Sequence, residues 1–326
     1  MNTVFVGLSG GVDSAVSAYL LQKAGYKVHG AFIKVWEPDW LPCTSGEDRL
    51  DAMRVAASLG IPFHTYDLAE EYKREVVDYF VDEYRAGRTP NPDVMCNRAI
   101  KFGAFWERAK ADGADYIATG HYAQIEKQDE SYKMKRGIDP NKDQSYFLWT
   151  LTQDDLAHVL FPVGALPKSQ VREIATEAGL PNAAKRDSQG LCFLGHVDMQ
   201  EFLMRMLPAE PGDSRLYTLG QKVDGKYVVA KDVATNTVVT ATDTTDAGGR
   251  IYELGHVNWI QETPDPKAGY EAEVRYHGEH YPVRIVGSTV IFDQPVLAAI
   301  GQSLVVYDPK SGECVGGGII ASCRLS

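Results

Sequence analysis

In the first half of the chain, short apolar runs alternate with segments in which apolar residues recur every three to four positions. The runs TVFVGLS, KVHGAFIKVW, IPFHTYDL and DYIATGHY have the length and composition of buried strands. The periodic segments between them predict helices, and glycines follow the first two of these. Strands that alternate with helices in this way predict an α/β domain with a doubly wound parallel sheet.

The second half of the chain changes its pattern twice. From 145 to 207 the pattern is helical and is interrupted by prolines. Beyond 207, apolar and polar residues alternate in short segments bounded by Gly, Asp and Pro, which predicts antiparallel β-structure. We therefore expect three parts: an α/β domain with a helical extension over 1–207, a small β-rich central module over 208–262, and a C-terminal antiparallel β-barrel over 263–326.

Composition and charge exclude several classes of protein. A chain of 326 residues, 44% hydrophobic and 24% charged, is typical of a globular protein with two or three domains. It contains no apolar run long enough to cross a bilayer, and it begins directly with an apolar strand. We therefore expect a cytoplasmic protein without a membrane partner. The net charge of −11 argues against non-specific coating of nucleic acid, although a local basic patch is compatible with it.

The segment LSGGVDS, between the first strand and the first helix, has the features of an anion-binding turn. Two glycines let the backbone approach an anion, and the following helix directs its N–H groups towards it. Ser9 and Ser14 add hydroxyl donors. The carboxylate of Asp13 would repel a phosphate unless a cation lay between them, and Mg²⁺ is the natural choice. The segment matches neither GK[ST] nor GxGxxG, and a plain tight turn before a helix is the alternative interpretation.

The five cysteines are scattered and form no CxxC pair, which indicates reduced thiols and argues against a disulfide framework or a zinc ribbon. Cys96 follows two prolines and precedes a predicted helix, in a stretch from 85 to 110 that holds six Lys or Arg against two acidic residues. Such surroundings lower the pKa of a thiol and attract a polyanion. These local features fit a reactive thiol and a buried structural one equally well. For Cys192, and for Cys43, Cys314 and Cys323, local composition favours a structural role.

The string SGGVDS resembles the PP-loop of the N-type ATP pyrophosphatases, which split ATP into AMP and pyrophosphate. This resemblance implies that ATP and Mg²⁺ bind here and that the loop holds the leaving pyrophosphate. It further implies that the energy of ATP adenylates a carbonyl or carboxylate oxygen of a substrate. The loop alone leaves that substrate open, because the superfamily contains NAD, GMP and argininosuccinate synthetases as well as tRNA-modifying enzymes.

A closer resemblance covers nearly the whole chain in the right order. It rests on the segments GLSGGVDSAVSA, GRTPNPDVMCN, DYIATGHYA, NKDQSYFLWTL, LFPVGALPKSQVREIA, DSQGLCFLG, LYTLGQK and GECVGGGII. These segments are similar to those of the MnmA family of tRNA-uridine 2-sulfurtransferases, which thiolate the wobble uridine of certain tRNAs. The resemblance implies that ATP adenylates the C2 oxygen of uridine 34. A persulfide sulfur then replaces this oxygen, and the products are 2-thiouridine, AMP and pyrophosphate.

The resemblance also implies a role for individual residues. Contacts with ATP are expected from Gly7, Leu8, Ser9, Gly10, Gly11, Val12, Asp13, Ser14, Ile33 and Gly120. Contacts with the target base are expected from Asn91, Pro92 and Asp93, and contacts with the rest of the tRNA from His121, Lys142, Asp143, Gln144, Arg275, Tyr276 and Gln302. Asp13, the nucleophile Cys96 and the persulfide carrier Cys192 are the expected catalytic residues, and no metal site made of protein ligands is expected. A sulfur-relay protein or a cysteine desulfurase is the expected sulfur donor, and a monomer is the expected state.

Two features depart from the family pattern. PAEPGD runs directly into SRLYTLGQK, where family members usually carry an additional stretch, so the central module is expected to be shortened. Lys222 also stands where the family has an arginine, which weakens one bidentate phosphate contact.

Three other interpretations remain open from the residues themselves. A small-molecule adenylating ligase could use the same loop, but it would need neither paired cysteines nor a β-rich C-terminal half. A non-catalytic nucleotide-binding module would bind ATP without releasing AMP. An iron–sulfur type of tRNA thiolase would hold a cluster on Cys96, Cys192 and a third ligand.

Overall fold

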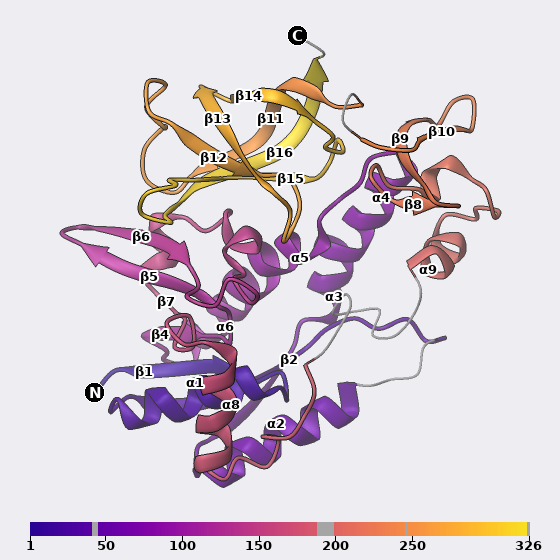
Figure 1. Cartoon of the computed structure of the whole chain (residues 1–326). Helices are drawn as coiled ribbons and strands as arrows, with labels where there is room; N and C mark the ends of the chain where they lie inside the picture. Colours follow the sequence, from indigo (N-terminus) through magenta and orange to yellow (C-terminus); the bar gives the residue numbers. More distant parts are fainter. Residues whose placement is uncertain (41–44, 188–198, 245–246, 325–326) are drawn as a thin grey trace.

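The computed structural model describes residues 1–40, 45–187, 199–244 and 247–324. The N-terminal half contains a five-stranded sheet in the order β3-β2-β1-β4-β7, with all neighbours parallel (Figure 1). Its strands are β1 (Thr3–Gly7), β2 (Lys27–Lys34), β3 (Phe63–Asp67), β4 (Tyr116–Ala118) and β7 (Val159–Leu160). The predicted parallel sheet is therefore confirmed. Strand β7 lies in the stretch predicted to be helical, because two residues are recognisable as a strand only through their pairing with β4.

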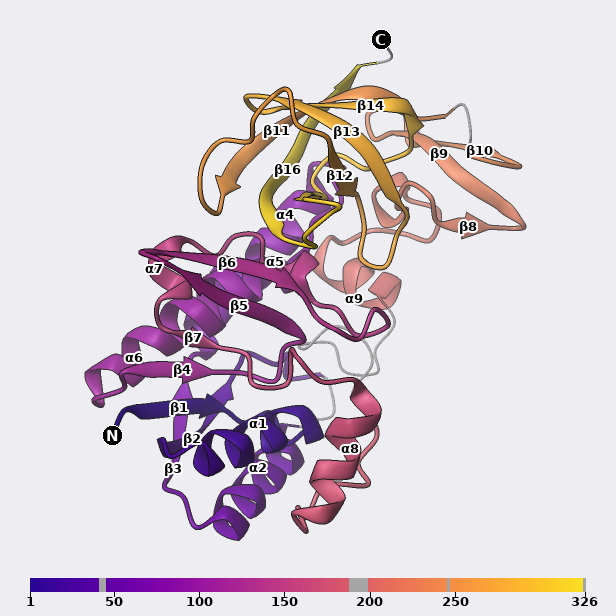
Figure 2. The ribbon, with the colours of Figure 1, turned by 60° about the vertical axis from the view of Figure 1, so that its left-hand side comes forward.

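Helices cover both faces of this sheet, as a doubly wound fold requires (Figure 2). One face packs against α1 (Val12–Lys23), α2 (Ser45–Leu59) and α8 (Lys168–Glu177). On the other side of the sheet, α6 (Phe105–Ala111) packs on β4. The hydrophobic cluster on this side continues through α3 (Ala69–Tyr72), the π-helical segments η1 (Lys73–Asp78) and η2 (Cys96–Ala104), α4 (Tyr79–Arg85) and α5 (Pro92–Met95) towards the barrel, where α4 and α5 lie (Figure 1). Alternate side chains of β1 serve the two faces: Val4 and Val6 join the first cluster, and Phe5 joins the second.

Several short elements connect this domain to the rest of the chain. A hairpin of β5 (Ala123–Gln128) and β6 (Ser131–Arg136), which the hydrophobic pattern does not indicate, follows β4. After it come η3 (Ser145–Leu148), α7 (Gln153–Leu156) and, beyond α8, α9 (Met199–Met206). The central module is a three-stranded antiparallel sheet of β8 (Lys222–Val223), β9 (Lys226–Asp232) and β10 (Thr237–Ala241). At the shortened junction, Asp213 accepts a hydrogen bond from the backbone of Arg215 and caps the short helix η4 (Ser214–Leu216).

The C-terminal part is a closed antiparallel barrel in the order β11-β14-β13-β12-β15-β16. Its strands are β11 (Gly249–Trp259), β12 (Tyr270–Glu273), β13 (His280–Val286), β14 (Thr289–Val296), β15 (Ser303–Tyr307) and β16 (Cys314–Arg324). The predicted boundary at 262/263 assigns 249–259 to the central module. This boundary needs correction, because β11 pairs with β14 and β16 and closes the barrel.

Buried hydrogen bonds join the barrel to the N-terminal domain. The indole N–H of Trp149 donates to Ser303 Oγ at 3.0 Å, and the Tyr146 hydroxyl donates to the Ser303 carbonyl at 2.9 Å. From the barrel, the Asn258 amide donates to the carbonyls of Trp149 and Leu151. Both aromatic side chains are fully buried, so the domain and the barrel share one continuous core. Within the described ranges, none of the helices combines the length and apolar character needed to cross a bilayer.

Candidate active site

The loop between β1 and α1 is a glycine-dependent turn with the N-terminus of α1 at its end. Gly10 has a φ of +78°, and a Cβ atom there would lie 2.6 Å from the Asp48 carbonyl oxygen, so no larger residue fits. Gly11 is the N-cap residue of α1, so no side chain caps the first N–H groups of this helix. The two serines brace the loop: Ser9 Oγ accepts from the Gly11 N–H, and Ser14 Oγ accepts from the Ser9 N–H. The backbone of this turn has the geometry of an anion site.

A lysine from a distant part of the chain lies beside this lysine-free loop. Lys168, the first residue of α8, places its Nζ 2.7 and 2.8 Å from the two carboxylate oxygens of Asp13. The Tyr122 hydroxyl donates to the same carboxylate at 2.6 Å, and Tyr122 has a raised pKa because of burial and this carboxylate. Lys168 is only 9% exposed. It is not among the residues that the motifs assign to the site, because nothing within the segment LPKSQ indicates a contact with Asp13.

The expected nucleotide contacts Ile33 and Gly120 lie at neighbouring strand ends. Strand β1 pairs with β2 on one side and with β4 on the other, so the ends of all three strands meet at the loop. A Cβ atom on Gly120 would lie 2.7 Å from the Ser14 nitrogen and 2.8 Å from the Asp13 carbonyl carbon. Glycine is therefore required there, because the end of β4 touches the first turn of α1.

The segment that holds Cys96 starts its helix earlier than predicted. Asn91 caps α5 by accepting the Val94 N–H at 3.3 Å, and Pro92 occupies the first helical position. Cys96 therefore follows the first helical turn instead of preceding the helix, and the dipole effect on its thiol is weaker there. Cys96 is 3% exposed and belongs to the core shared with the barrel. Burial also raises the pKa of Asp93.

The barrel holds the segment that precedes Asn91. The Gln302 amide donates to the carbonyls of Thr89 and Pro90 at 3.3 and 3.1 Å. The Thr89 N–H in turn donates to the Ile300 carbonyl at 2.9 Å. The side chain of Gln302, expected to contact tRNA, is thus engaged with the protein backbone.

The expected tRNA contacts at 142–144 are anchored as well. Lys142 Nζ lies 2.7 Å from a carboxylate oxygen of Asp187, and Gln144 Oε1 accepts the Tyr122 N–H at 3.1 Å. Asp143 accepts hydrogen bonds from the backbone N–H groups of Gly137 and Ser145. These bonds fix the loop between the phosphate-loop domain and the barrel.

His121 lies below the surface. It is 8% exposed, and its ring packs against Phe102 and Phe161. Its Nδ1 lies 2.7 Å from the Thr119 hydroxyl oxygen. Burial lowers its pKa well below the usual value, so the imidazole is neutral at physiological pH.

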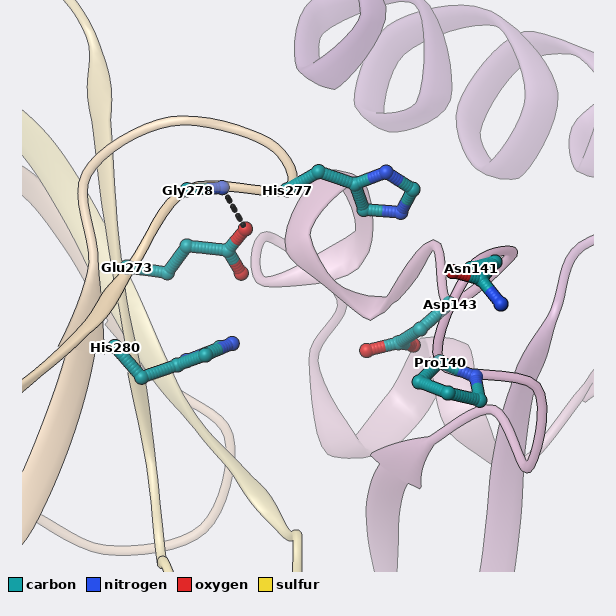
Figure 3. Close-up of a pocket in the computed structure, with 7 residues that line it drawn as sticks. All are labelled: Pro140, Asn141, Asp143, Glu273, His277, Gly278 and His280. Carbon is teal, nitrogen blue, oxygen red and sulfur yellow. Dashed lines mark hydrogen bonds between the residues drawn. The ribbon is translucent and has the colours of Figure 1, made fainter.

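A polar cavity lies between the loop that contains residues 140–143 and the barrel (Figure 3). Its volume is about 280 Å³, and it is lined by Pro140, Asn141, Asp143, Glu273, His277, Gly278 and His280. The carboxylates of Glu273 and Asp143 point into it from opposite sides. Burial, and then the charge of Asp143, raise the pKa of Glu273 to about 7. Tyr276 lies on the same turn, and its ring packs against that of Phe147 in a tilted arrangement with 4.3 Å between the ring centroids. The cavity therefore adjoins both expected tRNA segments, 142–144 and 275–276.

Three of the five cysteines lie among the described residues. Cys192 and Cys43 lie outside the described residues. Cys314 is buried, and burial raises the pKa of its thiol, which agrees with the expected structural role. Cys323 is exposed on β16. Cys96 is the candidate reactive thiol whose surroundings the structure defines.

Within the parts of the chain described here, no group of three or more His, Cys, Asp or Glu side chains could hold a metal ion. At the phosphate loop, both oxygens of Asp13 are already bonded to Lys168. The residues there do not form a ready-made Mg²⁺ site. Such an ion would need phosphate oxygens and water as its main ligands.

Comparisons with known proteins cover nearly the whole chain. A family profile described as "tRNA methyl transferase HUP domain" matches residues 2–196, and one described as "Aminomethyltransferase beta-barrel domain" matches residues 250–320. The tRNA-specific 2-thiouridylase MnmA 2 of Geobacillus kaustophilus is 44% identical over 352 residues, which cover 97% of this chain and 94% of the relative. The corresponding enzyme of Idiomarina loihiensis is 43% identical over 357 residues (97% and 95%), and that of Thiobacillus denitrificans is 45% identical over 363 residues (97% and 99%). Each alignment is longer than 326 residues, so the relatives contain residues that this chain lacks within the aligned region.

Proposed function

The chain belongs to the family of tRNA-specific 2-thiouridylases, and from this premise we propose how its residues replace the C2 oxygen of the wobble uridine by sulfur. It is a tRNA-uridine 2-sulfurtransferase, an enzyme whose substrate is tRNA. The observation that carries this conclusion is 43 to 45% identity to three such enzymes over 97% of the chain. The description of the first profile names a methyl transferase, so the test below also measures methylation.

ATP is the proposed energy source. The turn from 7 to 14 holds the pyrophosphate end through its backbone N–H groups, and Lys168 adds the positive charge that the loop itself lacks. Ile33 and Gly120, at the adjoining strand ends, flank the nucleoside. If Mg²⁺ is bound, it would be held mainly by phosphate oxygens and water and would supply additional positive charge there. Asp13 acts here by holding Lys168 in place.

The uridine is held by 91–93, next to Cys96. Once the C2 oxygen carries AMP, the terminal sulfur of a persulfide on Cys192 attacks C2, and AMP departs with that oxygen. The Cys96 thiolate then attacks the inner sulfur, which leaves the terminal sulfur on C2 and joins Cys96 and Cys192 in a disulfide. A reductant must cleave this disulfide before the next turnover.

The remaining contacts and partners follow the family. The proposed tRNA contacts are Lys142, Asp143, Gln144, Arg275 and Tyr276. For His121 and Gln302 we propose a supporting role behind this surface, because His121 is buried and Gln302 is bonded to the backbone of 89–90. A sulfur-relay protein or a cysteine desulfurase loads Cys192. The enzyme acts as a monomer in the cytoplasm.

The test is a reconstituted reaction of the purified chain with tRNA, ATP, Mg²⁺ and a persulfide donor. The nucleosides of the digested tRNA are analysed by mass, and AMP is measured in parallel. Formation of 2-thiouridine together with tRNA-dependent AMP is the expected result. A methylated nucleoside, AMP release stimulated by a metabolite instead of tRNA, or activity that depends on an iron–sulfur chromophore would each contradict the proposal.

A further inference from the structure

Asp187 connects two parts of the site that are far apart in sequence. Its carboxylate lies 2.7 Å from Lys142 Nζ, 2.9 Å from Lys168 Nζ and 2.6 Å from the guanidinium of Arg172. Lys142 belongs to the loop before η3, whereas Lys168 and Arg172 lie in the first turns of α8. One carboxylate thus joins the loop at 142–144 to the helix that supplies the lysine of the phosphate loop.

The contacts continue to the phosphate loop as a row of alternating charges. Asp13 is bonded to Lys168, Lys168 to Asp187, and Asp187 to Lys142. Lys168 is shared between two carboxylates, so its ammonium group has little freedom to turn away from the loop. Arg172 gives the row an additional positive charge. Asp139 also lies at this place, where its carboxylate accepts the Lys168 backbone N–H at 2.9 Å, so three cations face three carboxylates.

Asp187 is ionised throughout the physiological range. Burial alone would raise its pKa, but the hydrogen bonds from Lys142 and Lys168 outweigh burial and hold the pKa at about 2. The carboxylate therefore stays charged near neutral pH.

We propose that Asp187 is a positioning residue for adenylation. Its carboxylate sets the distance between the lysine at the ATP phosphates, Lys168, and the lysine at the tRNA, Lys142. This inference rests on the proposed function, because adenylation requires an ATP phosphate and a uridine oxygen to be held in a fixed relation. Errors of about 1 Å in such a relation can cost on the order of 100-fold in rate.

The Asp187→Asn variant separates positioning from attraction. It keeps the size of the side chain but removes its negative charge, so the local charge becomes more positive and polyanions are not bound more weakly. We expect KM for ATP and Kd for tRNA to stay within about threefold of wild type. We expect kcat for tRNA-dependent AMP formation to fall at least tenfold, because both lysines lose their common anchor.

Asp51→Asn is the matched control. Asp51 accepts from Lys185 at 2.8 Å and from Arg54 at 2.9 Å but bonds neither Lys142 nor Lys168 in any contact described here. Its kcat should equal that of wild type. Asp187→Glu, which keeps the charge and lengthens the side chain, should retain normal KM values and lose about threefold or more in kcat. This second variant decides the question if Asp187→Asn does not fold.

Two results would overturn the inference. One is a kcat for Asp187→Asn within twofold of wild type. The other is a parallel loss of tRNA affinity, ATP affinity and melting temperature, which would make Asp187 merely structural. If the wild-type chain itself forms no tRNA-dependent AMP, the proposed function fails, and that failure is separate from either result.

Discussion

At the scale of single residues, the site depends on charged groups that the sequence places far apart. Lys168 and Asp13 are 155 positions apart in the sequence, yet their side chains form an ion pair that joins α8 to the phosphate loop. A buried lysine requires such partners, since an unpaired ammonium group would be too costly to bury. The loop motif alone could not indicate this lysine, because the contact exists only after α8 has packed on α1.

Replacing Lys168 by Met should lower ATP-dependent AMP formation at least 100-fold. The substitution keeps most of the side-chain volume and removes the positive charge beside the phosphates. AMP release and melting temperature are measured together. Lys133→Met is the control. Lys133 lies on β6, its Nζ is 2.9 Å from a carboxylate oxygen of Glu313, and neither residue belongs to the phosphate loop. An AMP yield from Lys168→Met equal to that of the control would contradict the assignment.

The two reactive cysteines should fail at different steps. Cys192→Ser should block sulfur loading and thiolation but leave tRNA adenylation measurable, because the ATP site is made of other residues. Cys96→Ser should accept sulfur on Cys192 but form no thiolated product and no internal disulfide. Persulfide labelling with peptide mass mapping reports each step, and Cys323→Ser, on the exposed end of β16, is the control. Sulfur mapped to Cys96 would reverse the two roles, and wild-type thiolation by Cys96→Ser would remove Cys96 from the mechanism.

At the scale of elements, function depends on how loops from separate parts of the fold hold one another. The barrel turn at 299–302 makes hydrogen bonds with the segment that precedes α5. The Gln302 amide donates to two carbonyls of this segment, and the Ile300 carbonyl accepts an N–H from it. These hydrogen bonds fix the residues directly before Pro92, where α5 begins. We therefore expect them to position the proposed base-binding turn at 91–93. The barrel therefore holds in place the segment that leads into the proposed base-binding turn.

Gln302→Ala should lower kcat/KM for tRNA about tenfold while leaving KM for ATP unchanged. The substitution leaves two backbone carbonyls without their donor, and each lost hydrogen bond costs about 1 kcal/mol in stability. Initial rates at varied tRNA and varied ATP separate the two effects. Gln261→Ala is the control, since the Gln261 amide makes only long contacts, of 3.4 and 3.5 Å, with the β6 segment. An equal rise in both KM values would contradict a role limited to the base-binding turn.

The sequence predicts elements with strong local signals and misses those defined by pairing. Four of the five parallel strands have apolar runs of their own, whereas β7 is two residues long and exists only through β4. The hairpin β5–β6 is largely polar, so its alternation is weak. Among the candidate residues, the glycines of the loop are predictable because their backbone geometry has a local signature. Lys168 and Asp187 are not, because their partners come from other elements.

At the scale of the whole molecule, the net charge of −11 and the binding of tRNA must be reconciled. The basic stretch from 85 to 110 is less basic in the fold than in the sequence. Arg85, Arg88 and Arg108 each pair with an acidic side chain of α3 or α4. Few phosphate contacts are then available, and selectivity must come from shape and from the base-binding turn.

The affinity for tRNA should therefore depend on salt only moderately. Each phosphate contact contributes about −0.7 to −0.9 to the slope of log K against log salt, so two to four contacts give a slope between about −1.5 and −3.5. Binding measured by fluorescence anisotropy from low to moderate salt tests this. A slope near zero would contradict phosphate contacts altogether, and one steeper than about −5 would contradict the neutralisation of the basic stretch.

The central claim is that ATP activates the C2 oxygen of the uridine, and an oxygen label tests it most directly. tRNA carrying ¹⁸O at C2 of the wobble uridine is thiolated by the wild-type enzyme, and the AMP formed is analysed by mass. We expect the ¹⁸O to appear in the phosphate of AMP, one atom for each 2-thiouridine, because the bond from C2 to oxygen breaks after adenylation. Unlabelled AMP, with the ¹⁸O released as water or retained in the tRNA, would contradict this claim.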